Sequence, residues 1–344
     1  MKRIPVGLLV LLYIAIYIPY VVLTRWLATT RLPGFNQPLT GLEVVPSMVM
    51  LSWLMALIFI FASGWYKFAH QFQIGWLKLP RPTRWTLLSA FAAALILVTV
   101  PLSFTFKSVS IPFVQLMLRG DILIIAPVVD FLAHRRVHRR SWIALILTAI
   151  GAVVAVSARG GFKMPPLCWV TIALYAAGYM LRLYVMSRIA KTGATGETER
   201  YYVEEQLVAY PLALLIMAVL AVMHIDGQDG ALHRGFIEAW HSGALPYLAA
   251  SALPIFFASV LGTLILLNKH ENSFCVPLER SGSILAGIAG SLILAYWFGQ
   301  HMPSGAEFFG AALLILAIVI LTLRPPKLSA TGGRTQIPPR RSTG

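Results

Sequence analysis

The sequence predicts an all-α polytopic membrane protein in which ten transmembrane helices form two inverted five-helix repeats. Three observations support this fold class: an apolar composition, ten apolar segments of spanning length, and basic gaps that alternate with nearly uncharged ones. Of the 344 residues, 58% are hydrophobic and only 12% are charged, and the mean hydropathy is +0.75. Because soluble domains carry about 25% charged residues, a water-soluble fold of this size is excluded.

Each apolar segment is long enough to cross a hydrocarbon layer about 30 Å thick as a helix. The first follows Lys2 and Arg3 as in a signal peptide, but no small-residue cleavage site comes promptly after it, so we expect an uncleaved span. In chain order, the predicted spans are residues 5–23, 44–65, 85–106, 108–131, 141–158, 166–187, 204–223, 244–267, 273–298 and 306–323.

The longer segments between and after the spans have distinct compositions. Residues 66–84 are aromatic and basic, so we expect them to lie at the membrane interface. Residues 224–242 are long enough to form a short surface helix. The tail, residues 326–344, is rich in Gly, Pro and Arg and is predicted to be disordered and cytoplasmic.

The distribution of Lys and Arg predicts the orientation in the membrane. A formal net charge of +15 would suggest a nucleic-acid partner in a soluble protein. Here most basic residues lie in alternate gaps, on the side of the N-terminus. By the positive-inside rule, both termini are expected to be cytoplasmic, and no nucleic-acid partner is expected.

The spans divide into two sets of five, residues 1–158 and 159–325. Residues 106–112 resemble residues 271–277, each at the opening of a span, with an offset of about 165 residues. Residues 141–151 and 307–317 show a similar pairing of aromatic and small side chains. Because five is odd, duplicated units must insert in opposite orientations, as in transporters whose site lies at the repeat interface. A chance match between two apolar sequences is the alternative.

Polar side chains inside the spans are the candidate substrate-binding groups, since charges in hydrocarbon normally face a cavity or a partner. Arg presents a rigid fork of donors that suits carboxylate or phosphate. Arginines from three helices therefore suggest an anion clamp, with nearby acids pairing with them or receiving a substrate amine. The candidates are Gln115, Arg119, Asp121, Tyr179, Arg182, Glu279, Arg280 and Ser283.

The same charges have a structural interpretation, which stays open at this point. Arg119 could pair with Glu279, and Asp121 with Arg280, as intramembrane ion pairs. The two interpretations overlap, because a transporter can break such pairs to admit its substrate.

Two further residues are candidates for a gate or for coupling to protons. Lys107 lies at the predicted external bend before the fourth span; it is either an external gate or a lysine that reaches the interface. Glu205 begins the predicted seventh span next to Glu204; it either couples transport to protons or complements a helix N-terminus.

Other chemistries find no support in the sequence. There is no phosphate-binding glycine loop with its lysine, no zinc-protease helix and no serine nucleophile elbow. Cys168 and Cys275 lie in apolar segments and offer neither a disulfide framework nor a metal site. No cofactor, no metal and no enzymatic activity are therefore expected.

The five-plus-five plan resembles the drug/metabolite transporter superfamily, including bacterial EamA-type exporters. The resemblance is carried by residues 107–130, 135–140, 142–151, 273–290 and 308–317. It implies a bacterial cytoplasmic (inner) membrane location, secondary transport without ATP, and a cavity lined by the first, third, fourth, sixth, eighth and ninth spans. Phosphate-sugar and nucleotide-sugar members are similar in using basic residues on the ninth span. Arg280 fits that pattern, but its neighbour Glu279 is acidic where those relatives carry a second basic residue.

These observations predict a secondary active transporter that moves a small anionic or zwitterionic metabolite by alternating access. Its partners would be a small-molecule substrate and membrane lipids, with a proton gradient as driving force, and a homo-oligomer is left open. One alternative is a flippase for a lipid or lipid-linked headgroup. Another is a membrane-embedded transferase, for which no convincing reactive set is found.

Overall fold

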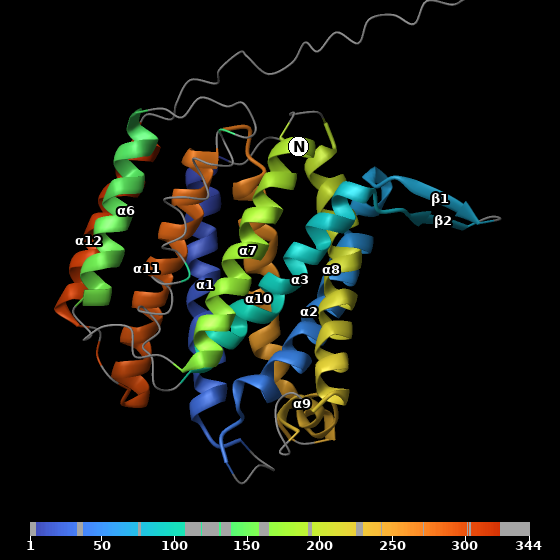
Figure 1. Ribbon diagram of the computed structural model, residues 1–344, viewed down its shortest axis with the longest axis horizontal. Coiled ribbons are helices and arrows are strands. Elements are labelled where there is room, and N and C mark those ends of the chain that lie inside the picture. The colour runs from blue at the N-terminus through green and yellow to red at the C-terminus, as the bar shows by residue number, and fades with distance from the viewer. Residues whose placement is uncertain are drawn as a thin grey trace, which may run out of the picture.

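The computed structural model describes most of the chain (Figure 1). The described residues are 5–32, 37–74, 77–106, 118, 131, 139–157, 165–191, 195–224, 230–241, 243–270, 272–300, 302 and 304–323. The predicted fourth span, apart from Leu118 and Phe131, and the predicted tail lie outside them.

The described chain is a bundle of helices with one small hairpin. Seven of its helices are long and apolar enough to cross a membrane, which supports a polytopic helical membrane protein. The elements are α1 (Val6–Thr29), α2 (Gly41–Ala62), the 3-10 helix η1 (Trp65–Phe68), β1 (Gln71–Ile74), β2 (Leu77–Pro80), α3 (Arg84–Thr105), α6 (Arg139–Ser157), α7 (Pro166–Ile189), α8 (Glu197–Val222), α9 (Ala231–His241), α10 (Leu245–Leu266), α11 (Asn272–Phe298) and α12 (Gly305–Leu323).

Most of these helices fall within a few residues of a predicted span, and the short surface helix expected in residues 224–242 is confirmed as α9. Two predicted boundaries are wrong. The first span continues to Thr29, and the seventh begins at Glu197. Both errors come from charged residues that a hydropathy pattern assigns to loops. The structure places these residues within helices and buries Arg25 and Glu197.

Arg25 shows why α1 is longer than expected. Its side chain is buried, and Nη1 donates to the carbonyl oxygens of Phe104 at 3.2 Å and Phe106 at 2.6 Å. The last carbonyls of a helix have no partner within it, so Arg25 satisfies the end of α3. This contact joins α1 to α3, and Arg25, which follows the predicted first span, belongs to the helix.

Two ends of the bundle can be distinguished (Figure 1). At the hairpin end, β1 and β2 lie between the end of α2 and the start of α3. At the α9 end, α9 packs on the start of α2, where Arg234 Nε donates to Glu43 Oε1 at 2.7 Å and Ser47 Oγ to the Gly235 carbonyl at 2.7 Å. Thr40 and Glu43 also form a capping box at the start of α2.

The outer surface of the bundle is apolar, and its interior holds polar side chains. Large apolar residues such as Leu11, Val153 and Trp297 are exposed, as expected where lipid replaces water. Ser52, Glu205 and Arg280 are buried. Because lipid gives no hydrogen bonds, these interior groups need partners within the protein.

Helices α6 and α12 pack against each other at one side of the bundle through a pair of glycines (Figure 1). A Cβ atom built on Gly151 would lie 3.1 Å from the Gly310 carbonyl oxygen, and one on Gly310 would lie 3.0 Å from that of Gly151. Glycine thus permits a backbone-to-backbone contact typical of membrane helices.

We expect Gly151→Leu and Gly310→Leu each to destabilise the protein by about 1–3 kcal/mol, because each overpacks the α6–α12 contact. Thermal unfolding in detergent would detect a lower midpoint. The matched control is Gly305→Leu, whose Cβ meets no atom within 4 Å. An equal effect of all three substitutions would contradict this account.

Candidate functional site

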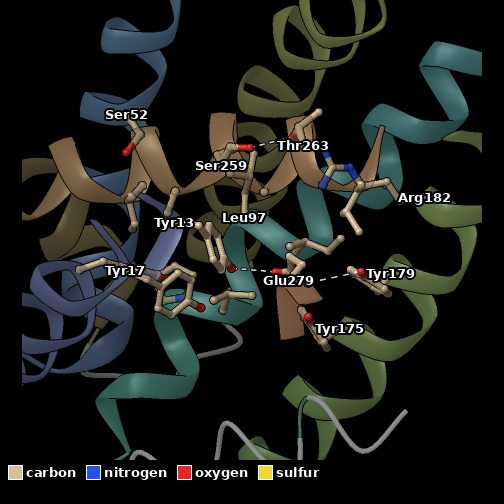
Figure 2. Close-up of a pocket in the computed structure, with 18 of the residues that line it drawn as sticks. Tyr13, Tyr17, Ser52, Leu97, Tyr175, Tyr179, Arg182, Ser259, Thr263 and Glu279 are labelled. Carbon is tan, nitrogen blue, oxygen red and sulfur yellow. Dashed lines mark hydrogen bonds between the residues drawn. The ribbon is translucent and has the colours of Figure 1, made fainter. Parts of the chain in front are cut away.

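A cavity with about 730 Å³ of atom-free space, part of it open to the surroundings, lies among the helices (Figure 2). Tyrosine rings and aliphatic side chains form most of its wall, with a few hydroxyl groups and two charged groups. Its lining residues are Tyr13, Tyr17, Tyr20, Val49, Ser52, Ile96, Leu97, Val100, Pro101, Tyr175, Tyr179, Arg182, Tyr210, Ile255, Ala258, Ser259, Gly262, Thr263, Leu266 and Glu279.

One stripe of α1 supplies three of the tyrosines. Tyr13, Tyr17 and Tyr20 are spaced four and three residues apart, which places them on one face of the helix. Their ring centroids lie 5.1 Å and 5.0 Å apart along the stripe. Phe104 of α3 packs edge-on against Tyr20 at 5.4 Å. These ring contacts hold the α1 face of the cavity in place.

Glu279 of α11 is the acidic group of the cavity wall. Tyr13 donates its hydroxyl to Glu279 Oε1 at 2.7 Å, and the Tyr179 hydroxyl lies 3.5 Å from Oε2 (Figure 2). A carboxylate in an apolar wall is costly unless it is hydrogen-bonded or paired. The two phenols, on α1 and α7, therefore stabilise Glu279 and link it across the cavity.

Arg280, the next residue, is fully buried and does not line the cavity. Its guanidinium lies 3.5 Å from the centroid of the Tyr179 ring and 5.0 Å from that of Tyr175. Its Nε is 3.6 Å from Glu279 Oε2. Arg280 thus places a positive charge behind the tyrosine wall through cation–π contacts.

Arg182 of α7 makes a two-pronged ion pair with Glu205 of α8. Its Nε donates to Oε1 at 2.9 Å and its Nη2 to Oε2 at 2.5 Å. Nη2 also donates to the Thr263 hydroxyl of α10 at 3.1 Å. The Glu205 carboxylate accepts further bonds from Ser89, Tyr201 and Gln206.

This pair changes the interpretation of both residues. Arg182 borders the cavity, but its donors are directed to Glu205 and Thr263. Glu205 is fully buried. It lies in the third turn of α8, because the helix begins at Glu197 and not at Glu204 as predicted. The expectation that Glu204 and Glu205 lie at the start of their helix is therefore wrong. The first turn of α8 is charged, so a hydropathy pattern does not detect where the helix begins.

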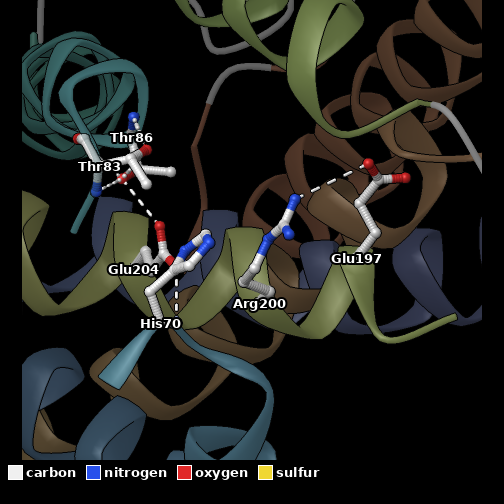
Figure 3. Close-up of polar contacts among 6 residues, drawn as sticks. All are labelled: His70, Thr83, Thr86, Glu197, Arg200 and Glu204. Carbon is white, nitrogen blue, oxygen red and sulfur yellow. Dashed lines mark hydrogen bonds and ion pairs between the residues drawn. The ribbon is translucent and has the colours of Figure 1, made fainter. Parts of the chain in front are cut away.

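A second polar cluster lies at the hairpin end (Figure 3). Buried Glu204 accepts hydrogen bonds from the His70 backbone N–H at 3.0 Å and from the Thr86 hydroxyl at 3.0 Å. The His70 ring Nδ1 lies 2.7 Å from the same carboxylate. Nearby, Arg200 pairs with Glu197 at 3.9 Å. Glu204 thus fixes the segment that leads into β1.

The structure brings together some of the predicted site residues. Tyr179, Arg182 and Glu279 line the cavity. Behind its wall lie Arg280 and also Ser283, whose hydroxyl donates to the Arg280 carbonyl at 2.8 Å. Lys107, Gln115, Arg119 and Asp121 lie outside the described residues, and so do the predicted pairs of Arg119 with Glu279 and of Asp121 with Arg280.

Most residues of the cavity wall were not predicted from the sequence. The tyrosines of α1, together with Tyr210, Ser259 and Thr263, line the cavity but were not predicted. A signal for the first group was present, because three tyrosines share one stripe of a span that is otherwise aliphatic. Isolated hydroxyl residues such as Thr263 gave no comparable signal.

The comparisons with known proteins concern the fold. No family model matches the chain, and no curated protein matches it. Among solved structures, 28 chains match. One, described only as the crystal structure of a protein, shares 18% identity with a TM-score of 0.52, covering 90% of this chain and 96% of its own. At that identity the likeness shows a shared fold and nothing about activity.

We expect Arg182→Met to destabilise the protein by about 3–5 kcal/mol, because it leaves the buried Glu205 carboxylate without its counter-charge. Adding Glu205→Gln to that variant should restore much of the loss, since the uncompensated charge disappears. Denaturant unfolding of the two single variants and the double variant measures this coupling. Strictly additive effects would contradict the ion-pair account.

Proposed function

We propose that this protein is a secondary active transporter that moves a small zwitterionic metabolite by alternating access. The observation that carries the proposal is the cavity within the bundle, walled by tyrosines and bearing the Glu279 carboxylate. Binding sites for small molecules are mostly apolar with a few placed polar groups. A transporter needs such a site at mid-depth, between parts that move relative to each other.

The charges at the cavity favour a zwitterion over a simple anion. Arg182 is neutralised by Glu205, and Arg280 lies beside Glu279, so these four groups carry no net formal charge. Arg280 is screened from the cavity by the Tyr179 ring. Glu279 and the surrounding phenols would receive the ammonium group of the substrate. The substrate carboxylate would accept hydrogen bonds from hydroxyl groups of the cavity wall.

The packing of the described helices supports two inverted repeats. Helices α1, α3, α6, α8 and α11 run from the hairpin end to the α9 end, and α2, α7, α10 and α12 run in the opposite direction (Figure 1). The equivalent helices of the two halves, α1 with α7, α2 with α8, α3 with α10 and α6 with α12, are therefore antiparallel. Moreover, α3 packs on α7 and α8 as α10 packs on α1 and α2.

The cavity lies between these two halves. Tyr13 belongs to the first half and Glu279 to the second, so their hydrogen bond crosses the interface that alternating access would open. Helices α1, α3, α7, α10 and α11 contribute to the wall and correspond to the first, third, sixth, eighth and ninth spans of a ten-span plan. Helices α2 and α8 also contribute, through Ser52 and Tyr210. On this basis we extend the proposal to a drug/metabolite transporter of the EamA type, with both termini cytoplasmic and Glu279 as the proton-coupled acid.

We expect Glu279→Gln to lower transport of a zwitterionic amino acid by about tenfold or more, because the substrate ammonium loses a charge-assisted hydrogen bond. Tyr13→Phe should cause a smaller loss, within about tenfold, since it removes one neutral hydrogen bond. Tracer uptake into proteoliposomes, with a proton gradient in either direction, measures both effects.

Tyr296→Phe is the matched control, because Tyr296 is 82% exposed on the outside of the bundle. The assay compares zwitterionic amino acids with amine-free carboxylates, carboxylate-free amines and a headgroup-labelled lipid. Transport of amine-free carboxylates alone, or of the lipid alone, would contradict the proposal. So would wild-type transport by Glu279→Gln.

A further inference from the structure

The hairpin formed by β1 and β2 has one apolar and one polar face. In its register Phe72 pairs with Leu79, while Gln71 pairs with Pro80 and Gln73 with Lys78. Paired residues of an antiparallel ladder share a face, and successive residues alternate between faces. Phe72 and Leu79 are therefore on one face, and Gln71 and Gln73 on the other. Phe72 is 50% exposed and Leu79 is 41% exposed.

The hairpin extends sideways from the bundle, across the direction of the helices and near their ends (Figure 1). Its root is fixed to the bundle, because the Arg81 N–H donates to the His70 carbonyl at 2.6 Å and His70 binds buried Glu204. The strands thus project from a rigid base over the region that lipid occupies around a membrane-spanning bundle.

The elements that precede and follow the hairpin in the chain also carry exposed apolar side chains. Phe61 at the end of α2 and Phe68 of η1 are exposed, as are Trp85 and Leu88 at the start of α3. Exposed apolar side chains on adjoining elements of a membrane protein face the lipid. Phe72 and Leu79 add two exposed apolar side chains on the hairpin, which projects from the helices (Figure 1).

The charges around the hairpin match an anionic lipid surface. Lys67, Arg81, Arg84 and Arg188 are exposed at this end, whereas Glu197 and Glu204 are buried. The Arg188 guanidinium lies 5.0 Å over the Trp85 ring, a pairing of an aromatic ring and a cation that suits the headgroup layer. Each basic residue near such a surface adds to its attraction for anionic headgroups.

We propose that the β1–β2 hairpin lies in the membrane interface, with Phe72 and Leu79 directed into the acyl boundary and its basic surroundings bound to anionic headgroups. A strand-to-strand contact with a second copy is the competing arrangement, since both strands have an open edge. The apolar face and the exposed cations favour lipid, because edge pairing with another strand would use neither.

Site-specific labelling of the full-length protein in lipid nanodiscs tests this proposal. A polarity-sensitive fluorophore is attached in turn to Phe72→Cys and to the adjacent Gln71→Cys. The two native cysteines, Cys168 and Cys275, are buried, and labelling of the unmodified protein measures their background. The nanodiscs contain lipids with a quencher placed high on the acyl chain.

We expect the label at residue 72 to show blue-shifted emission and strong quenching, and the label at residue 71 to show neither. Replacing zwitterionic lipid by a mixture with phosphatidylglycerol should increase the quenching at residue 72. Equal quenching at the two positions, or none at either, would overturn the proposal. A signal at residue 72 that depends on protein copies per nanodisc and not on the lipid quencher would overturn it in favour of a second copy.

A stability measurement gives an independent readout. The double variant Phe72→Gln, Leu79→Gln should lower the unfolding temperature in nanodiscs but not in detergent, whereas Gln71→Ser should change neither. Loss of stability in both media would indicate a structural role within the protein and contradict the proposal. The inference does not depend on the transported substrate, so its failure and that of the transport proposal can be distinguished.

Discussion

The ion pair between Arg182 and Glu205 is the interaction on which the interior of the bundle depends. A carboxylate removed from water is stable only if charge and hydrogen bonds replace its hydration. Glu205 receives both from three helices, and Arg182 extends the connection to a fourth through Thr263. The polar core therefore joins the two predicted halves and fixes the distance between the helices that enclose the cavity. The donors to Glu205 are Ser89, Arg182, Tyr201 and Gln206.

The second interior carboxylate is held quite differently. Glu279 accepts one short bond from a tyrosine and lies at longer distance from Tyr179 and Arg280. Its phenol partners come from opposite sides of the cavity. The two acids thus differ in role: Glu205 joins the helices around it, and Glu279 links α11 to α1 and α7 across the cavity.

The helices were predicted from the sequence more accurately than the residues of the candidate site. Apolar length alone locates α2, α10 and α12, because hydrocarbon thickness sets the length of a span. It failed where charged residues enter a helix, at Arg25 and at the start of α8, since burial of those charges depends on partners far away in the chain. For the same reason it identified Arg182 as a polar residue inside a span but not Glu205 as its partner.

The strands of the hairpin could not be predicted, for another reason. Four residues are too few for an alternating pattern to stand out, although the aromatic and basic composition of residues 66–84 indicates an interface segment. The cavity wall could be predicted only in part. The stripe of α1 is readable from spacing, whereas Tyr210 and Thr263 reach the cavity only because α8 and α10 pack around it.

The adjacency of Glu204 and Glu205 connects the root of the hairpin to the cavity wall. Glu204 binds the root of the hairpin, and Glu205, the next residue, binds the arginine that borders the cavity. A rotation of this one turn of α8 would move both contacts together. If the hairpin lies in the membrane interface, as proposed above, the thickness and lateral pressure of the bilayer would act on the cavity wall through this turn of α8.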